Sequence, residues 1–139
     1  PWEYQHDVDI INGESISIFN NNRLDLNFDK NIKFNDIIIY NFKENKTSFL
    51  LKDTFVKNKV QTSREGLAEI FKDGSVFVEE TNHGRLIMFD KEGQKIWEYI
   101  NREKNDNKIY GLSWSRIIDL NIKNFKNKLR DNNECKVYK

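Results

Sequence analysis

One histidine and two arginines are the side chains of this sequence whose chemistry stands out. They lie in three short polar segments, Gln5-His6-Asp7, Ser63-Arg64-Glu65 and Ser115-Arg116. An imidazole can hydrogen-bond to an anion, and guanidinium groups bind sulfate or phosphate oxygens. Together these side chains would suit an oxyanion such as sulfate or phosphate, provided that the fold brings them together.

Each of these residues also has a purely structural interpretation. A histidine in a channel can fill space and hydrogen-bond to neighbouring backbone, and Arg64 and Arg116 can form ordinary salt bridges between sheets. Asp7 is not expected to orient His6, because adjacent residues of a strand project to opposite faces. Whether these residues have a functional or a structural role depends on where the fold places the three segments.

The chain repeats itself at a spacing typical of β-propeller blades. Trp2-Glu3-Tyr4 recurs as Trp97-Glu98-Tyr99, an offset of 97 − 2 = 95 residues. Almost halfway between them, the apolar tripeptide Phe49-Leu50-Leu51 is a weaker match to the same motif. Half of this offset is close to the roughly 40 to 50 residues of a four-stranded blade. An antiparallel β-sandwich is the alternative fold, but it gives no reason for the repeat.

Each period contains four short segments rich in β-branched and aromatic residues, which predict strands. The predicted strands are Asp7 to Ile11, Ser15 to Asn20, Asp36 to Phe42, Thr47 to Leu51, Leu67 to Phe71, Ser75 to Glu79, Arg85 to Phe89 and Lys95 to Tyr99. Asn12-Gly13 and Asp73-Gly74 predict two-residue hairpin loops with positive φ. Ile37 to Tyr40 and Leu86 to Phe89 are apolar on successive residues, so both faces of those strands should be covered.

We therefore predict an all-β fold, with two four-stranded antiparallel β-propeller blades from a larger propeller at residues 5–52 and 55–100. Pro1 to Tyr4 would be the outer strand of a preceding blade. Residues 108–139 would hold the start of a next blade, with an inner strand at Gly111 to Leu120, and a tail with a possible short helix at Phe125 to Arg130. The remaining blades are the expected partners, and bare blade faces would favour self-association.

A propeller would also bring the three polar segments together. The innermost strands of all blades converge on a central channel, and the segments stand where those strands begin. His6, Arg64 and Arg116 could then meet around one small anion.

The composition argues against several other classes of protein. Lys+Arg 23 against Asp+Glu 22 leaves a net charge of only +1, whereas a nucleic-acid surface needs a basic stripe or face. The single cysteine, Cys135, cannot form an intrachain disulfide, and Cys/His zinc patterns are absent, so we expect no disulfide scaffold and no metal site. The longest apolar run, Ile37-Ile38-Ile39, is far too short to span a bilayer.

The N-terminal segment resembles bacterial arylsulfotransferases. In that family Trp-x-x-Gln-His precedes a strand ending in Phe-Asp-Asn, and the present chain has Trp2-Glu3-Tyr4-Gln5-His6, then Phe19-Asn20-Asn21. Gly84-Arg85-Leu86 through Gly93 to Trp97-Glu98-Tyr99 is similar to a blade pattern of the wider arylsulfotransferase-like group. The resemblance extends over most of Pro1 to Leu120.

The resemblance implies that His6 takes a sulfuryl group from an aryl sulfate and passes it to a phenol, without a cofactor. Arg64 and Arg116 match no family motif, and their suggested role in anion binding depends on position alone. The other active-site histidines and arginine of the family lie upstream of its Gln-His motif, so the present chain alone should be inactive. A periplasmic location would follow if the protein resembles the bacterial enzymes in this respect. The alternative function is a non-catalytic propeller that binds a protein or a small anion.

Overall fold

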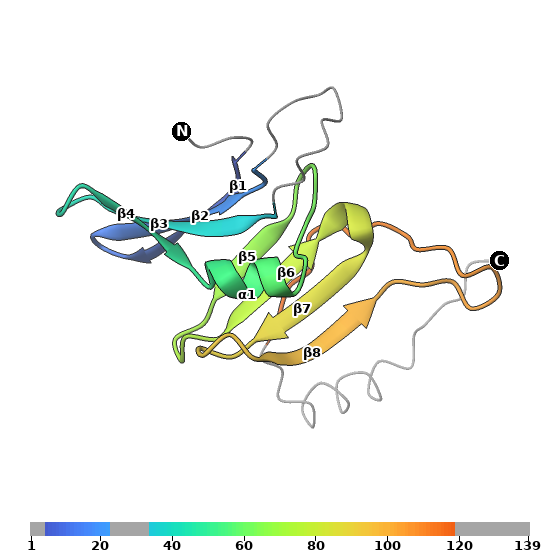
Figure 1. The fold of residues 1–139 in the computed structure, drawn as a ribbon. Helices are drawn as coiled ribbons and strands as arrows, with labels where there is room; N and C mark the ends of the chain where they lie inside the picture. Colours follow the sequence, from blue (N-terminus) through green and yellow to red (C-terminus); the bar gives the residue numbers. More distant parts are fainter. Residues whose placement is uncertain (1–4, 23–33, 119–139) are drawn as a thin grey trace, which may run out of the picture.

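The protein consists of two four-stranded antiparallel sheets, each with its strands in sequence order (Figure 1). The structure is a computed structural model and describes residues 5–22 and 34–118. The first sheet contains β1 (Gln5–Asn12), β2 (Ser15–Asn20), β3 (Asp36–Asn41) and β4 (Lys46–Leu50); the second contains β5 (Leu67–Ile70), β6 (Val76–Glu80), β7 (Arg85–Phe89) and β8 (Lys95–Ile100). The two predicted blades are therefore confirmed as two separate meander sheets.

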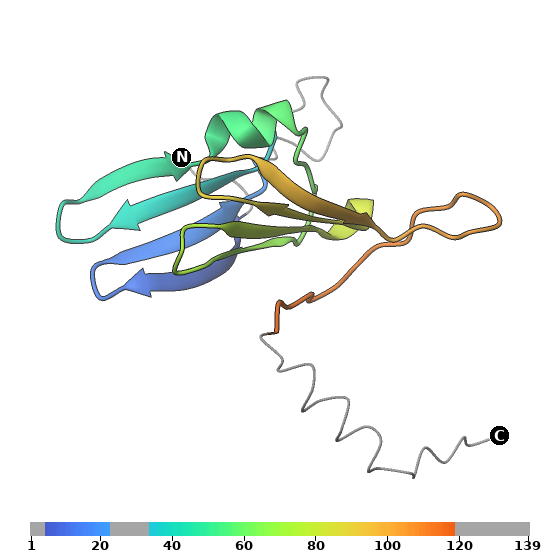
Figure 2. The ribbon, with the colours of Figure 1, turned by 90° about the horizontal axis from the view of Figure 1, so that it is seen from below.

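The two sheets face each other, with their first strands in contact (Figure 2). Phe19 and Ile37 of the first sheet pack in one buried cluster with residues of β5, β6 and β7. Ile87 and Phe89 of β7 belong to this cluster, and their neighbours Leu86 and Met88 lie on the opposite face because side chains alternate along a strand. We predicted that both faces of this strand would be covered, but only the face with Ile87 and Phe89 is buried, whereas Leu86 and Met88 are partly exposed.

A short helix between the sheets, α1 (Lys52–Lys57), was not predicted. The chain must cross here from β4 at one edge of the first sheet to β5, which contacts β1 at the other edge. Leu51 adopts a left-handed conformation with φ of 52° and starts the helix. Phe55 is fully buried, and the centre of its ring lies 5.9 Å from the centre of the Phe89 ring. The helix thus closes the space between the sheets at this end with an aromatic side chain.

The hairpin loops differ in detail from the two-residue loops that we predicted. Between β5 and β6 the amide of Phe71 donates to Ser75, and the amide of Gly74 donates back to Phe71. This pattern is a three-residue loop in which glycine takes the left-handed position, here with φ of 86°. The β1–β2 loop does have two residues, because Asn12 pairs with Ser15, but its Gly13 has no positive φ.

The segment that follows β8 does not form the predicted strand. We expected an inner strand at Gly111 to Leu120, and no strand is present at 111–118. The amide of Leu112 instead donates to the carbonyl of Thr81 over 3.0 Å. The predicted strand Pro1 to Tyr4 and helix Phe125 to Arg130 lie outside the described residues. Within the described ranges no helix is long and apolar enough to cross a bilayer.

Gly66 precedes β5, and its substitution offers a direct test of this packing. It has φ of 95°, and a Cβ atom would lie 2.6 Å from Thr62 Cγ2 and 2.7 Å from Phe19 Cε1. Gly66→Ala should therefore lower the free energy of unfolding by about 2 to 3 kcal/mol in urea titrations, through overpacking and backbone strain. Gly13→Ala is the matched control, because no atom lies within 4 Å of its added Cβ. Equal stabilities of the two variants would contradict this packing.

Candidate functional site

An open cleft of about 280 Å³ lies where the beginnings of the two first strands meet the segment after β8. The residues that line it are His6, Asp7, Glu65, Gly66, Leu67, Glu79, Thr81, Ser113 and Trp114. Parts of the chain that are far apart in sequence, represented by His6, Glu65 and Trp114, therefore share one cavity. The structure brings the three polar segments close to one another, although not all of their side chains enter this cleft.

His6 is exposed on β1 and pairs with Phe19 of β2. The next pair in the ladder joins Val8 to Ile18, so Asp7 is an extra residue with no partner of its own in the ladder. Asp7 has φ of 50°, the left-handed conformation that only a few non-glycine residues adopt. This bulge interrupts the alternation of side chains, which explains why His6 and Asp7 line the same cleft despite being neighbours in the strand.

The Asp7 carboxylate reaches across to the second sheet. Its Oδ2 atom accepts a hydrogen bond of 3.0 Å from the backbone amide of Ala68 in β5. Burial raises the pKa of the Asp7 carboxyl above its ordinary value, although the Ala68 amide and the charge of Arg116 act in the opposite direction. The side chain next to His6 is thus anchored to the other inner strand.

Glu79 is a buried carboxylate at the same cleft that the sequence analysis did not single out. It is 1% exposed, and its two oxygens accept hydrogen bonds from the Thr81 hydroxyl at 2.8 Å and the Ser115 amide at 2.6 Å. These bonds hold the segment that contains Trp114 and Ser115 against the end of β6. The adjacent glutamates that end the apolar run Val76 to Val78 were the signal in the sequence that could have revealed it.

The two arginines do not line the cleft that holds His6. Arg116 lines a second cleft of about 590 Å³ together with Asp7, Asp9 and Glu69, and its guanidinium lies 4.8 Å from the centre of the Trp114 ring. Arg64 is exposed and lines neither cleft. Among the described residues, the charged neighbours of His6 in its cleft are therefore carboxylates.

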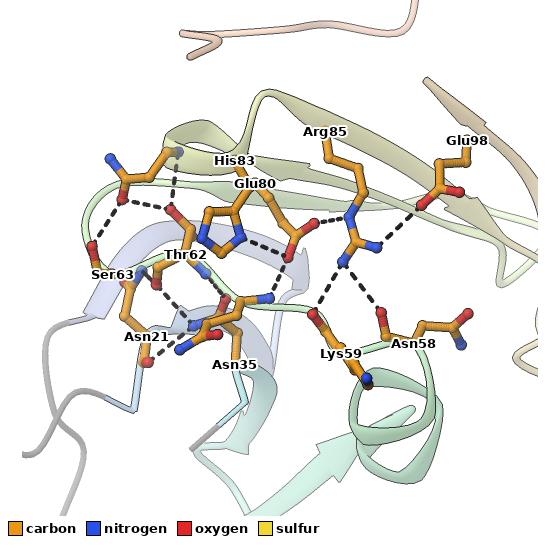
Figure 3. A network of polar contacts seen from close by, with 12 residues as sticks. Asn21, Asn35, Asn58, Lys59, Thr62, Ser63, Glu80, His83, Arg85 and Glu98 are labelled. Carbon is orange, nitrogen blue, oxygen red and sulfur yellow. Dashed lines mark hydrogen bonds and ion pairs between the residues drawn. The ribbon is translucent and has the colours of Figure 1, made fainter. Parts of the chain in front are cut away.

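A network of asparagine side chains positions the approach to β5 (Figure 3). The Nδ2 atom of Asn21 donates to the carbonyls of Thr62 at 2.9 Å and Glu65 at 2.8 Å. Asn35 donates to the carbonyl of Thr62 and accepts from the amide of the same residue. These bonds satisfy buried backbone groups of the connection and fix the cleft residues that follow it.

An ion pair between the buried Glu80 and the partly buried Arg85 holds the same connection from the other sheet (Figure 3). Glu80 is fully buried and accepts hydrogen bonds from the Gln61 amide and the Arg85 guanidinium. Arg85 also donates to the carbonyls of Asn58 at 3.2 Å and Lys59 at 3.1 Å, at the end of α1. Burial alone would lower the pKa of Arg85, but hydrogen bonds and charges of Glu80 and Glu98 raise it overall.

No group of three or more histidine, cysteine, aspartate or glutamate side chains within 5–22 and 34–118 is arranged to hold a metal ion. The side chains that line the cleft supply imidazole, carboxylate, hydroxyl and indole groups.

The raised pKa of Asp7 gives a prediction with a definite sign. Because folding disfavours its charged form, ionised Asp7 reduces stability above its folded pKa, and the cost vanishes as the pH falls below the ordinary value of 3.8. Asp7→Asn should therefore raise the free energy of unfolding at pH 7, by no more than about 1 kcal/mol for this half-exposed group. Melting curves between pH 7 and 4 should show the advantage shrinking, and an advantage that grows toward acid would be the opposite result.

Comparison with known proteins identifies a family. The model of the family described as arylsulfotransferase (ASST) matches residues 1–102 of the 139-residue chain, a range that includes both sheets. No curated protein and no solved structure matches the chain.

Proposed function

Since the chain belongs to the arylsulfotransferase (ASST) family, we propose that it forms part of a propeller enzyme that transfers a sulfuryl group from an aryl sulfate to a phenol. His6 would be the residue that carries the group between donor and acceptor. The observation that supports this role is the exposed position of His6 in the cleft where both first strands begin.

The reaction would proceed through two displacements at sulfur. In the first, the lone pair of an unprotonated His6 ring nitrogen forms an N–S bond while the S–O bond to the aryl group breaks, and the aryl oxygen leaves with the bonding electrons. In the second, the oxygen of the phenol attacks sulfur, the N–S electrons return to the imidazole, and the phenol proton is released. Imidazole alone supplies the nucleophile, so neither half-reaction requires a cofactor.

Charge that develops on the sulfuryl oxygens needs cationic or hydrogen-bond donors. Arg116 is a candidate, because its charge acts on Asp7 next to His6 although it lines the neighbouring cleft. Arg64 is exposed and would contribute only through rearrangement of its side chain. We propose that the other donors come from further blades, in line with the position of the family's remaining active-site residues.

A transfer assay with the intact protein that contains this sequence tests the proposal. Supplied with 4-nitrophenyl sulfate and a phenol, it should release 4-nitrophenol and form the sulfated phenol, with ping-pong kinetics. The 139-residue chain alone should show no turnover, because one nucleophile without its positioning groups lacks a closed site. Absence of transfer by the intact protein would refute the proposed activity.

A non-catalytic propeller is the second candidate, and one observation favours it. Asp7, Glu65 and Glu79 line the cleft with His6, and carboxylates oppose the approach of a sulfate ester. In that case the intact protein would bind a ligand at this cleft without transfer. Calorimetry with 4-nitrophenyl sulfate, run beside the transfer assay, should then detect no binding of this ester.

We also propose that a further blade covers the outer face of the second sheet. Leu86 pairs with Tyr99 and Met88 with Trp97 on the face turned away from the buried cluster, and Trp97 and Tyr99 are 38% and 49% exposed. Aromatic and aliphatic side chains that share a face in this way favour burial against a partner. The isolated chain should therefore self-associate, with sedimentation coefficients that increase with concentration; a strictly monomeric chain would argue against a missing partner sheet.

A further inference from the structure

We infer that Asp7 is a positioning residue, which holds His6 at the cleft by anchoring the beginning of β1 to the Ala68 amide of β5. The inference deepens the proposed function and relies on it for its activity measurement. Asp7 lines the cleft beside His6 but would not react with the substrate; it would act through the placement of the neighbouring imidazole.

The backbone at Asp7 supports this role. Asp7 is the extra residue between the pairs His6–Phe19 and Val8–Ile18, in a left-handed conformation that is costly for a residue with a Cβ atom. A local cost of this kind persists where surrounding contacts require it. As a result, Asp7 is unpaired in the first sheet and its carboxylate points toward the second sheet.

The hydrogen bond formed by Asp7 links the two innermost strands. Ala68 is 4% exposed, and its amide donates to Asp7 Oδ2 over 3.0 Å. Without that acceptor a largely buried amide would lose its partner, which destabilises the local arrangement. Glu65, Gly66 and Leu67 precede this amide and line the cleft opposite His6, so the bond fixes the relative position of the two walls.

The acceptor oxygen matters more than the negative charge. Burial disfavours the ionised form of Asp7, as the raised pKa of this carboxyl indicates. An asparagine would keep an oxygen that can accept from Ala68, and it tolerates the left-handed conformation. A glycine would keep the backbone conformation but lose the acceptor.

This difference defines a matched pair of variants of the intact protein, Asp7→Asn and Asp7→Gly. Asp7→Asn should keep kcat for transfer from 4-nitrophenyl sulfate within about threefold of wild type, whereas Asp7→Gly should lose roughly a hundredfold in kcat with little change in donor KM. Asn45→Gly is the control, because Asn45 also has a left-handed φ, of 51°, but lies at the β3–β4 loop. It should leave kcat unchanged.

Hydrogen exchange at the Ala68 amide tests the anchor without any activity. Exchange should become at least about tenfold faster in Asp7→Gly and stay near wild type in Asp7→Asn, because only the latter retains the acceptor. Equal exchange in the two variants, or equal loss of kcat in both, would overturn the inference. If the wild-type protein transfers no sulfuryl group, the proposed function fails, and the exchange measurement alone decides whether Asp7 anchors β1.

Discussion

Replacement of Arg85 by methionine should lower the free energy of unfolding by about 3 to 5 kcal/mol. Glu80 is fully buried, and its carboxylate accepts a hydrogen bond from the Arg85 guanidinium. Methionine keeps much of the aliphatic stem of arginine but leaves that carboxylate without its counter-charge. The carbonyls of Asn58 and Lys59 at the end of α1 would lose their donor as well.

Equilibrium unfolding in urea, followed by tryptophan fluorescence, measures this loss. Lys95→Met is the matched control, because Lys95 pairs with Glu98 at the exposed end of the same network, 3.0 Å apart, and such pairs contribute about 0 to 1 kcal/mol. The double variant Glu80→Leu with Arg85→Met should recover part of the lost stability, since it removes both charges of the pair. A loss below about 1 kcal/mol in Arg85→Met would show that the pair does not hold the connection.

Substitution of His6 by alanine should have the largest effect on function. If His6 carries the sulfuryl group, its loss removes the covalent route, and kcat for transfer by the intact protein should fall at least a thousandfold, as roughly expected when a nucleophile is lost. The fold should be unaffected, because His6 is exposed on β1. Initial rates of 4-nitrophenol release in the presence of a phenol give the measurement.

The second histidine of the chain provides the control for this experiment. His83 lies in the short 3₁₀ helix Thr81–His83, is exposed, and has Nδ1 3.8 Å from Glu80. His83→Ala should keep transfer within about twofold of wild type, since its ring is not part of the cleft. Undiminished release of nitrophenol by His6→Ala would exclude the carrier role of His6, whatever the overall activity.

The strands could be predicted from sequence because local and long-range signals agree there. Arg85–Phe89 and Ser15–Asn20 have the predicted bounds, and the other strands differ by one or two residues at their ends. Runs of β-branched and aromatic residues between turn formers suffice for this, and the repeated Trp-Glu-Tyr motif adds the grouping into two units.

The helix α1 could not be found in this way. Its six residues, Lys52 to Lys57, include Thr54 and Val56, which favour strands, and no side chain caps its first turn. The helix depends on tertiary packing, since Phe55 fills the space beside Phe89. Tertiary packing of this kind determines whether a short helix forms, and the local sequence gives little indication of it.

The candidate site was predictable in part. The convergence of inner strands identified the three polar segments, and His6 and Glu65 do share a cleft. The side-chain directions were not predictable, because they depend on left-handed residues that line the cleft, Asp7, Glu65 and Trp114. These conformations change the direction of the backbone, which the alternation of side chains along a strand does not predict. As a result, Arg64 lies outside the cleft that its neighbour Glu65 lines.

The most direct measurement is the detection of a sulfuryl group on the protein itself. The intact protein is mixed with 4-nitrophenyl sulfate without acceptor, digested, and analysed by mass spectrometry. One sulfuryl group should appear on His6, in the peptide that contains Gln5 to Asn12, and addition of a phenol should remove it. Turnover with the group on another residue, or with no labelled residue at all, would contradict the role of His6 as carrier.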